Sequence, residues 1–352
     1  MKAWRVHGFG APEETFVLDD IAEPTAEMLA GMGMNLAGWA ALNADGGRAG
    51  TPHPSTDWVI MQMSAAALAL PDVTMCRGTY PVEVARPYTS GQEGVGTVIE
   101  ASPSRAHLIG RRVTACCIQP FGSLAPVSVG VGLIFEVPDG LDDEAAAGFV
   151  IPAHTAYHAT IRRGAVQEGE VVAVLGAAGG LGAAIIQLAV ARGARVVAIV
   201  GGAEKAAFCR ELGAEIAIDH QAGDFVAAAR EATGGRGVDV VIDPVQGEMG
   251  EAARDLIVAD GRHVLCGHAG GLKPIDPHFY LRNHTLVGAT LGGYPPDEMA
   301  RIERRAQDDI VELVERGAFR PVTSRVIDFD EVPAAVGDLD ARRTMGRVVV
   351  RI

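Results

Sequence analysis

The sequence predicts an α/β protein in which a doubly wound parallel sheet is joined to a β-rich domain. From about residue 171 to residue 290, buried strand patterns alternate with helix patterns, as in a parallel sheet covered by helices on both faces. Before about residue 140, short alternating strands are bounded by Gly, Pro and Ser instead. The chain has 352 residues, which is enough for two domains with separate cores.

The positions of the expected elements follow from hydrophobic periodicity. In the first part of the chain we expect strands at 2–10, 59–63, 94–101 and 111–118, and helical structure at 142–161. In the second part we expect strands at 171–176, 195–200, 215–219, 238–243, 261–267 and 284–290. We expect helices between them at 180–192, 204–212 and 225–232. We expect a further helix at 301–316 and a further strand at 346–352.

Composition and charge exclude several classes of function. Charged residues make up 21% of the chain and hydrophobic residues 48%, as in an ordinary globular protein. The net charge is −14 and no basic block offsets it, which argues against a nucleic-acid partner. No apolar run reaches the roughly 18 residues of a membrane span, and the first ten residues lack the apolar core of a signal peptide. The five cysteines lack metal-site spacing, so we expect reduced thiols in the cytoplasm.

A glycine-rich turn, VLGAAGGLGAA at 174–184, lies between the first strand and the first helix of the second part. Its small residues follow the pattern A-x-G-x-x-G of dinucleotide-binding turns. Small residues let the backbone approach a pyrophosphate, whose charge the helix N-terminus stabilises. A tight turn without a ligand is the alternative. We expect a dinucleotide to contact Ala177, Gly179, Gly180, Leu181 and Gly182.

The end of the second strand favours NADPH as that dinucleotide. An NAD site usually has Asp or Glu there to bind the ribose hydroxyls, but this chain has Gly201 and Gly202. Lys205, one of only three lysines, can supply the charge opposite a 2′-phosphate. Two alternatives stay open: Lys205 is a solvated residue of the next helix, or Glu204 reaches back to the ribose of NAD.

Further stretches complete a pattern along nearly the whole chain: MKAWRVHGFGAPE, PDVTMCRGTYP, GQEGVGTVIEA, GAAGGLGAAIIQLA, TGGRGVDVVIDPVQG and RRTMGRVVV. The chain thereby resembles the medium-chain dehydrogenase/reductase superfamily, and within it the zinc-independent NADPH:quinone oxidoreductase-like branch. The resemblance implies a GroES-like catalytic domain at 1–147, a Rossmann dinucleotide-binding domain at 148–292, and a segment at 293–352 that returns to the catalytic domain.

The resemblance also bears on zinc. Zinc alcohol dehydrogenases of this superfamily take ligands from a Cys and from a Gly-His-Glu triplet, where this chain has Ala69 and Gly91-Gln92-Glu93. Zinc needs Cys, His or carboxylate ligands that converge in a tetrahedron. We therefore expect no metal. Cys116 and Cys117 are expected to form a buried strand pair whose side chains face opposite ways.

Hydride transfer without a metal suits an acceptor that spreads its own developing charge, such as a quinone or an α,β-unsaturated carbonyl. The protein must then position the nicotinamide and stabilise an oxyanion or enolate. By resemblance, 71–81 forms the pocket wall and Tyr80 orients or protonates the substrate; a packing role before Pro81 is the alternative. Asp72 and Arg77 are expected to form an ion pair that shapes this loop, with direct catalysis as the second interpretation.

Other residues match positions that meet the cofactor in relatives. Thr155 is expected beside the nicotinamide, or else bonded to its own helix backbone. His220 is expected near the 2′-phosphate, or else solvated on the surface. Gly267 and His268 are expected to pass the nicotinamide ribose with their backbone. Ala69 stands where the family usually has Asn, which puts ordinary quinone reduction in doubt.

The leading function is an NADPH-dependent reductase of quinones or activated alkenes that acts on a small molecule. A dinucleotide-binding protein with little turnover is the second possibility. An enoyl thioester reductase is the third, although the sequence shows no obvious basic patch for the phosphates of coenzyme A. We expect a homodimer in which 285–290 forms an edge strand across a two-fold axis.

One feature departs from the family pattern. An insertion at about 25–58 replaces a short turn, and its first half is apolar, with Met28, Leu29 and Trp39. Long connections in compact domains are usually functional or disordered, and this one is too apolar for disorder. We expect either a short helical flap beside the substrate cleft or a surface elaboration or dimer contact.

Overall fold

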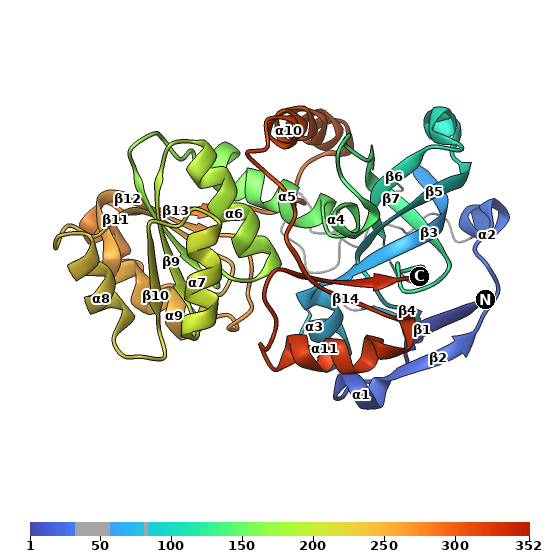
Figure 1. Ribbon diagram of the computed structural model, residues 1–352, viewed down its shortest axis with the longest axis horizontal. Helices are drawn as coiled ribbons and strands as arrows, with labels where there is room; N and C mark the ends of the chain where they lie inside the picture. The colour runs from blue at the N-terminus through green and yellow to red at the C-terminus, as the bar shows by residue number, and fades with distance from the viewer. Residues whose placement is uncertain (32–56, 81–83, 118) are drawn as a thin grey trace. The chain divides into compact units, whose positions relative to one another are not determined.

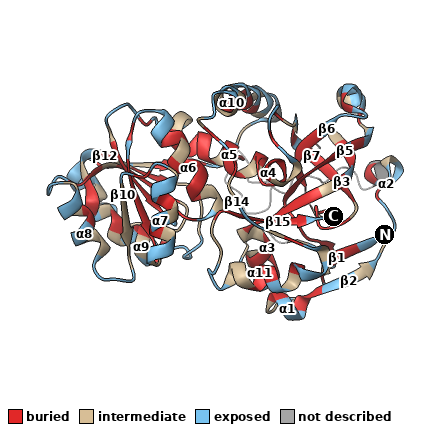
Figure 2. Cartoon of the chain, in the orientation of Figure 1, coloured by how far each residue is buried: buried red, intermediate tan, exposed pale blue. Residues whose placement is uncertain are grey.

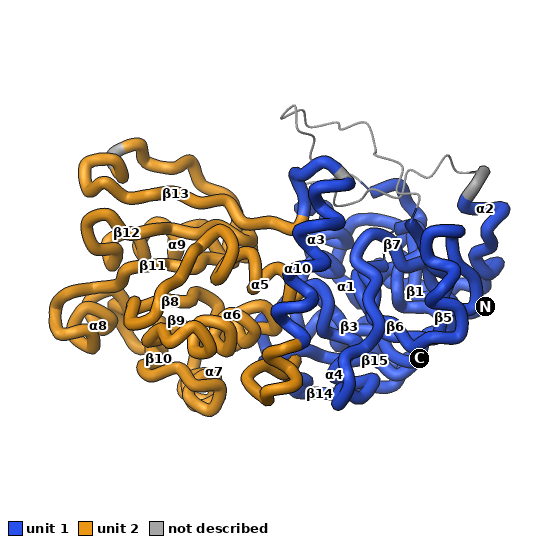
Figure 3. Tube along the Cα trace, turned by 90° about the horizontal axis from the view of Figure 1, so that it is seen from above, with its two compact units in different colours: residues 1–151, 292–311, 323–352 blue, residues 152–291, 312–322 orange. Residues whose placement is uncertain are grey.

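The structure is a computed structural model, and it describes residues 1–31, 57–80, 84–117 and 119–352. The chain forms two compact units (Figures 1 and 3). Unit 1 comprises residues 1–151, 292–311 and 323–352, and unit 2 comprises residues 152–291 and 312–322. The long helix α10 (Pro296–Glu315) contributes residues to both units.

Unit 2 contains the predicted doubly wound sheet. Its strands are β8 (Val171–Leu175), β9 (Arg195–Val200), β10 (Ile216–Asp219), β11 (Val238–Asp243), β12 (Ile257–Leu265) and β13 (Thr285–Gly288). Their order is β10-β9-β8-β11-β12-β13, and every pairing is parallel. The chain moves outward from β8 in one direction and later continues from β11 in the other. This reversal is the topological switch point at which such sheets bind ligands, beyond the carboxyl ends of the strands.

Helices cover this sheet on both faces, because right-handed crossovers that run in opposite directions from the switch point place their helices on opposite faces. They are α6 (Gly180–Ala191), α7 (Ala203–Glu211), α8 (Phe225–Ala232) and α9 (Gly247–Ala253). Ala229 of α8 and Ala253 of α9 belong to one buried cluster with residues of β8, β9 and β11. Every residue of β8 is buried, which explains its unbroken apolar sequence. In Figure 2, red marks buried residues and covers much of the strands in both units.

Unit 1 is the β-rich domain. Its larger sheet has the order β14-β15-β3-β5-β6-β7, and a smaller sheet has the order β2-β1-β4. These strands are β1 (Lys2–Val6), β2 (Phe16–Asp20), β3 (Trp58–Leu68), β4 (Tyr88–Thr89), β5 (Glu93–Ala101), β6 (Arg112–Cys117), β7 (Val127–Glu136), β14 (Thr323–Ile327) and β15 (Arg347–Arg351). Cys116 and Cys117 are both buried in β6, which confirms the expected strand pair.

The loop expected at 71–81 is wrong for residues 71–77, because these residues form a helix. Helix α3 (Leu70–Arg77) starts with Pro71 in its first turn and ends at Gly78, whose φ of 72° suits a helix C-terminus. Its buried face joins a core with α11 (Val332–Asp340) and the smaller sheet. Unit 1 also contains α1 (Pro12–Thr15), α4 (Asp143–Ala147) and the start of α5 (Val150–Tyr157).

Most of the insertion expected at about 25–58 lies outside the described residues, which end at residue 31 and resume at residue 57. The described part contains helix α2 (Ala26–Gly31), whose first turn is capped by Thr25 through the N–H of Met28. Leu29 of this helix is buried. In the portion of the chain that the structure describes, no helix has the length and apolar character needed to cross a membrane.

Candidate functional site

The glycine-rich turn joins β8 directly to α6, and its geometry favours glycine at one position and requires it at another. Gly176 has a φ of 56°, which favours glycine. A Cβ atom on Gly182 would lie 2.5 Å from the carbonyl oxygen of Gly176 and 2.6 Å from Cα of Ala177. Because both neighbours are backbone atoms, they cannot move aside. The first turn of α6 therefore packs against the strand end at a distance that any side chain would prevent.

The same turn leaves room for a ligand at the N-terminus of α6. Gly179 precedes the helix without a side-chain cap, and among the described residues a Cβ built on it would come within 4 Å only of the oxygen of Gly176, at 3.5 Å. Ala177 is buried, Gly179 is exposed, and Gly180 and Leu181 are partly exposed. The helix N-terminus and its open N–H groups fit an anionic pyrophosphate, so the five predicted residues form one cradle.

The carboxyl ends of β9 and β10 bring together the residues expected at the ribose phosphate. Gly202 has a φ of 103° and donates its N–H to Oδ1 of Asp219 at 2.8 Å. That backbone bond and a second one from Gln221 lower the pKa of Asp219. The ring of His220 lies against Gly201, since a Cβ there would be 3.1 Å from Nε2. Lys205 lies in the first turn of α7, partly exposed.

Asp219 and Gln221 at this edge were not predicted from the sequence. The signal was present, because the third strand ends at Asp219 and parallel strands place their carboxyl ends on one side of the sheet. Asp219 is the carboxylate that accepts the Gly202 N–H, and it is the last residue of β10 rather than of β9.

The loops after β11 and β12 form the other half of this sheet edge. A Cβ on Gly267 would lie 2.5 Å from the oxygen of Pro244, so these two loops touch through their backbones. In the second loop, Nε2 of His268 is buried and has no hydrogen-bond partner among the described residues. Burial lowers the pKa of His268, so its ring is neutral at pH 7. A buried polar atom without a partner fits a site that a cofactor completes.

Thr155 differs from its two neighbours in solvent exposure. His154 and Ala156 in α5 are fully buried, whereas Thr155 is partly exposed. The helix continues as a π-helix at His158–Arg162. Thr155 is therefore a residue of unit 2 that a ligand can contact, and its role at the nicotinamide stays a prediction.

In unit 1, Tyr80 follows α3, and its N–H bonds to the oxygen of Thr74 at 3.0 Å. Its ring packs against the core that α3 shares with α11. Burial raises the pKa of Tyr80, and nearby Cys116 and Asp72 raise it further. Tyr80 is a phenol at neutral pH, as tyrosine ordinarily is, and it can donate a hydrogen bond, although the raised pKa makes it a weaker acid.

The expected ion pair between Asp72 and Arg77 is wrong. Asp72 is fully buried, and its oxygens accept hydrogen bonds from the N–H of Ala69 at 2.8 Å, the hydroxyl of Ser90 at 2.8 Å and the N–H of Gly91 at 2.9 Å. Burial raises the pKa of Asp72, and these hydrogen bonds oppose the shift. Arg77 pairs instead with Asp340 of α11, through Nε at 3.1 Å. Asp72 thus joins the start of α3 to the turn between β4 and β5, which is a structural role.

The triplet Gly91-Gln92-Glu93 turns inward in this chain. The amide of Gln92 donates to the sulfur of Met75 at 3.5 Å. Glu93 is fully buried, pairs with Arg347 and accepts the N–H of Ile151 at 2.9 Å. Burial raises the pKa of Glu93, and Arg347 opposes this. Among the residues that the structure describes, no three His, Cys, Asp or Glu side chains are placed to hold a metal ion.

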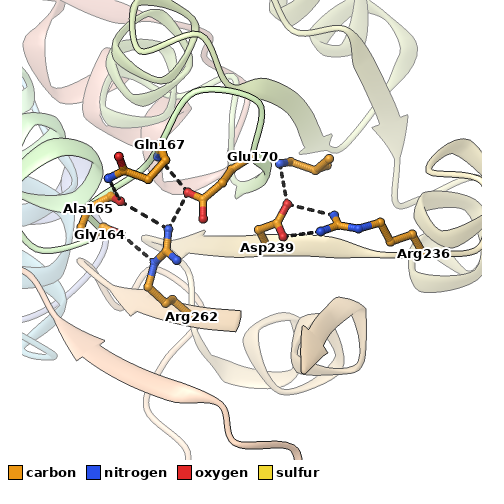
Figure 4. Close-up of polar contacts among 8 residues, drawn as sticks. Gly164, Ala165, Gln167, Glu170, Arg236, Asp239 and Arg262 are labelled. Carbon is orange, nitrogen blue, oxygen red and sulfur yellow. Dashed lines mark hydrogen bonds and ion pairs between the residues drawn. The ribbon is translucent and has the colours of Figure 1, made fainter. Parts of the chain in front are cut away.

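A charged cluster also lies at the amino-terminal edge of the parallel sheet, opposite the carboxyl edge described above, and it stabilises the fold. Figure 4 shows Arg262 of β12 bonded to Glu170 at 2.6 Å and to the oxygen of Gly164 at 2.8 Å. Asp239, at the start of β11, accepts from Arg236 and from the N–H of Val171. These contacts join the beginnings of β8 and β11 to Arg262 of β12, which pairs with Val240 of β11, and they lie away from the ends at which ligands bind.

Family models match both parts of the chain. Residues 55–137 match the model described as "Alcohol dehydrogenase GroES-like domain", and residues 180–307 match the model described as "Zinc-binding dehydrogenase". These ranges fall within the β-rich domain and, for the most part, the doubly wound sheet.

Individual proteins are also similar to this chain along most of its length. The chain is 28% identical over 286 residues to quinone oxidoreductase-like protein 2 of Rattus norvegicus, covering 80% of this chain and 81% of that protein. It is 31% identical over 285 residues to polyketide synthase GfsB of Streptomyces halstedii, covering 80% of this chain and 5% of the synthase. A crystal structure of the quinone oxidoreductase from Thermus thermophilus, also determined with NADPH, matches with 30% identity and a TM-score of 0.75, covering 100% of both chains.

Proposed function

The chain belongs to the quinone oxidoreductase-like branch of the medium-chain dehydrogenase/reductase superfamily, and from this premise we propose that it transfers hydride from NADPH to a quinone or an α,β-unsaturated carbonyl without a metal. The glycine cradle at the switch point is the observation that carries the proposal. The Thermus thermophilus relative, which has been determined with NADPH, supports the choice of cofactor.

The proposed cofactor would lie along the carboxyl edge of the sheet in unit 2. Residues Ala177 to Gly182 would hold the pyrophosphate on the N-terminus of α6, and Gly202, Lys205 and His220 would hold the 2′-phosphate. Thr155, Gly267 and His268 would line the nicotinamide half. When bound, NADPH supplies the hydride; the protein holds it in place and excludes water.

The acceptor chemistry is supported by residue types in unit 1. Ala69 offers no ligand atom, and the Gln92 amide is already used by Met75, so the residues at the usual zinc positions do not fit a metal. The Tyr80 hydroxyl is protonated at neutral pH, as tyrosine ordinarily is, so it could donate a hydrogen bond to the oxygen on which charge develops. Quinones and enones delocalise that charge themselves, which suits such a site.

Turnover distinguishes this proposal from the binding-protein alternative. The oxidation of NADPH should be followed by its absorbance over a panel of quinones and enones that differ in size, with NADPH affinity measured in parallel. We expect turnover with at least one class of acceptor. Tight NADPH binding with no turnover on any acceptor would favour the binding protein instead.

A thioester substrate is the second candidate, and the similarity to a polyketide synthase favours keeping it. An enoyl thioester is also an α,β-unsaturated carbonyl, so the same hydride chemistry applies. Adding crotonyl thioesters of N-acetylcysteamine and of coenzyme A to the panel tests this candidate. Selective turnover of the thioesters would replace the quinone assignment.

We predict that Lys205→Glu shifts cofactor preference from NADPH towards NADH by at least about tenfold, because a charge-assisted phosphate contact is lost and a repulsive charge replaces it. The measurement is the ratio of NADPH to NADH dissociation constants. Lys2→Glu is the control, because Lys2 pairs with Asp20 in the other unit. Equal effects of Lys205→Glu on both cofactors would show that another residue binds the phosphate.

We also propose a homodimer through β13, the last strand of the sheet in unit 2. Leu272, Tyr280 and Leu281 precede this strand and are 70%, 62% and 66% exposed, more than large apolar side chains usually are. We predict a dimer by light scattering at micromolar concentration, and a shift towards monomer in Leu272→Asp/Leu281→Asp. Ile99→Asp, at an exposed apolar site in unit 1, should leave the mass unchanged. A monomeric parent protein would contradict the proposal.

All five cysteines, each within the described residues, are free thiols. This supports a reducing compartment, so we place the proposed reaction in the cytoplasm.

A further inference from the structure

A buried polar network lies behind the sheet edge on which the proposed nicotinamide half rests. Asp243 ends β11 and is fully buried. Its Oδ1 accepts the N–H of Val245 at 2.8 Å and that of Gln246 at 2.6 Å, and its Oδ2 lies 2.9 Å from Nε2 of His263. Nδ1 of His263 accepts from Nε of Arg254 at 3.4 Å. This arrangement fixes the ring as the tautomer that donates from Nε2 to Asp243.

The network holds a strained residue. Gln246 has φ 57° and ψ −144°, a backbone region that is essentially restricted to glycine. A side chain persists there only when its surroundings over-determine the conformation. The carboxylate of Asp243, which binds the Gln246 N–H, supplies that constraint. Gly250 leaves space for the same carboxylate, because a Cβ on Gly250 would collide with Oδ2 of Asp243.

The strained backbone aims the Gln246 side chain at the loop after β12. Its amide nitrogen donates to the carbonyl oxygen of Gly267, next to His268. Two backbone bonds reinforce this contact: Gly270 N–H to the oxygen of Val245 at 2.7 Å, and Ala269 N–H to the oxygen of Pro244 at 3.2 Å. The loops at 244–247 and 266–271 are thus tied together at the carboxyl ends of adjacent strands.

We propose that Asp243, held by His263 and Arg254, is a positioning residue that keeps Gln246 in its strained conformation and so fixes the two loops against the nicotinamide half of the cofactor. The proposal rests on the proposed function, because it assumes a dinucleotide across the switch point. A merely structural tether would stabilise the protein without distinguishing one half of the cofactor from the other. The strain suggests that stability has been given up at Gln246 to aim its side chain.

The test compares whole NADPH with adenosine 2′,5′-bisphosphate, which represents only the adenosine half, by calorimetry. Gln246→Gly removes both the tether and the strain. We expect it to weaken NADPH binding about tenfold or more, because loops of the nicotinamide half lose their geometry. We expect its affinity for the bisphosphate to stay within about twofold, and its melting temperature to equal or exceed that of the parent protein.

Two carboxylate variants on the same strand provide a matched pair. Asp243→Asn should weaken NADPH binding and lower the melting temperature, because the amide cannot accept from both the Gln246 backbone and the His263 ring without conflict. Asp239→Asn, at the amino end of β11, should lower the melting temperature while leaving both affinities unchanged. If Asp243→Asn fails to fold, Gln246→Gly carries the test alone.

Gln246→Gly with parental NADPH affinity would overturn the proposal, as would an equal loss for NADPH and the bisphosphate. If the parent protein binds neither ligand, the proposed function fails rather than the positioning role.

Discussion

Replacement of Gly182 by valine is expected to abolish NADPH binding. Even the Cβ atom would lie 2.5 Å from the oxygen of Gly176 and 2.6 Å from Cα of Ala177, and neither backbone atom can move without pulling α6 off the end of β8. We predict a loss of affinity of about a hundredfold or more, since the turn that presents the N–H groups is displaced. Calorimetry with NADPH measures it, and a drop in melting temperature should accompany it.

Gly179→Ala separates binding from folding at the same turn. The part of the chain that the structure describes has room for this Cβ, which would touch only the Gly176 oxygen there, at 3.5 Å, and the backbone angles of Gly179 suit alanine. The melting temperature should therefore stay close to that of the parent, while NADPH affinity falls about tenfold because the methyl group holds the pyrophosphate away from the backbone. Unchanged NADPH affinity in Gly179→Ala would mean that the phosphates do not approach this turn.

The largest loss of stability is expected from Arg347→Met. Arg347 is the partner of Glu93, whose side chain is fully buried, so the substitution leaves a carboxylate without a counter-charge in the core of unit 1. Breaking a buried pair in this way costs about 3–5 kcal/mol of unfolding free energy. Urea denaturation followed by circular dichroism measures the change.

The double variant Glu93→Gln/Arg347→Met is the control for this prediction. It removes both charges, so it should recover much of the lost stability, because the penalty comes from the isolated charge rather than from the missing contact. A loss below about 1 kcal/mol for Arg347→Met would show that the pair is far more solvated than the structure indicates.

Most of the parallel sheet could be predicted because its information is local. An unbroken apolar run followed by glycines and a helix pattern identifies β8, the turn and α6 in one stretch. The strand expected at 261–267 begins earlier, at Ile257, and the reason is also local. Asp260 has a φ of 63° and lies before Gly261 within β12, so a pair that looks like a turn is an irregularity inside the strand.

The contacts of the candidate residues in unit 1 were harder to predict because they join residues that are distant in sequence. The partners of Asp72 include Ser90 and Gly91, and the partner of Arg77 is Asp340, which no spacing rule could supply. One error was avoidable, since Pro71 and Gly78 are ordinary signals for the first turn and the end of a helix. The hydrogen bonds that hold Gln246 could not be predicted either, because only the fold brings His263 next to Asp243.

The most direct test of metal-free reduction follows a labelled hydride. The purified protein should be analysed for zinc and then given NADPH carrying deuterium at the transferred C4 position, together with an enone that the panel shows to be a substrate. We predict less than about one tenth of an equivalent of zinc per chain, because neither Ala69 nor Gln92 can supply a zinc ligand of the kind required. We also predict deuterium at the β-carbon of the product, because that carbon accepts the hydride of NADPH. One tightly held zinc per chain whose removal stops turnover, or a product without deuterium, would contradict the account.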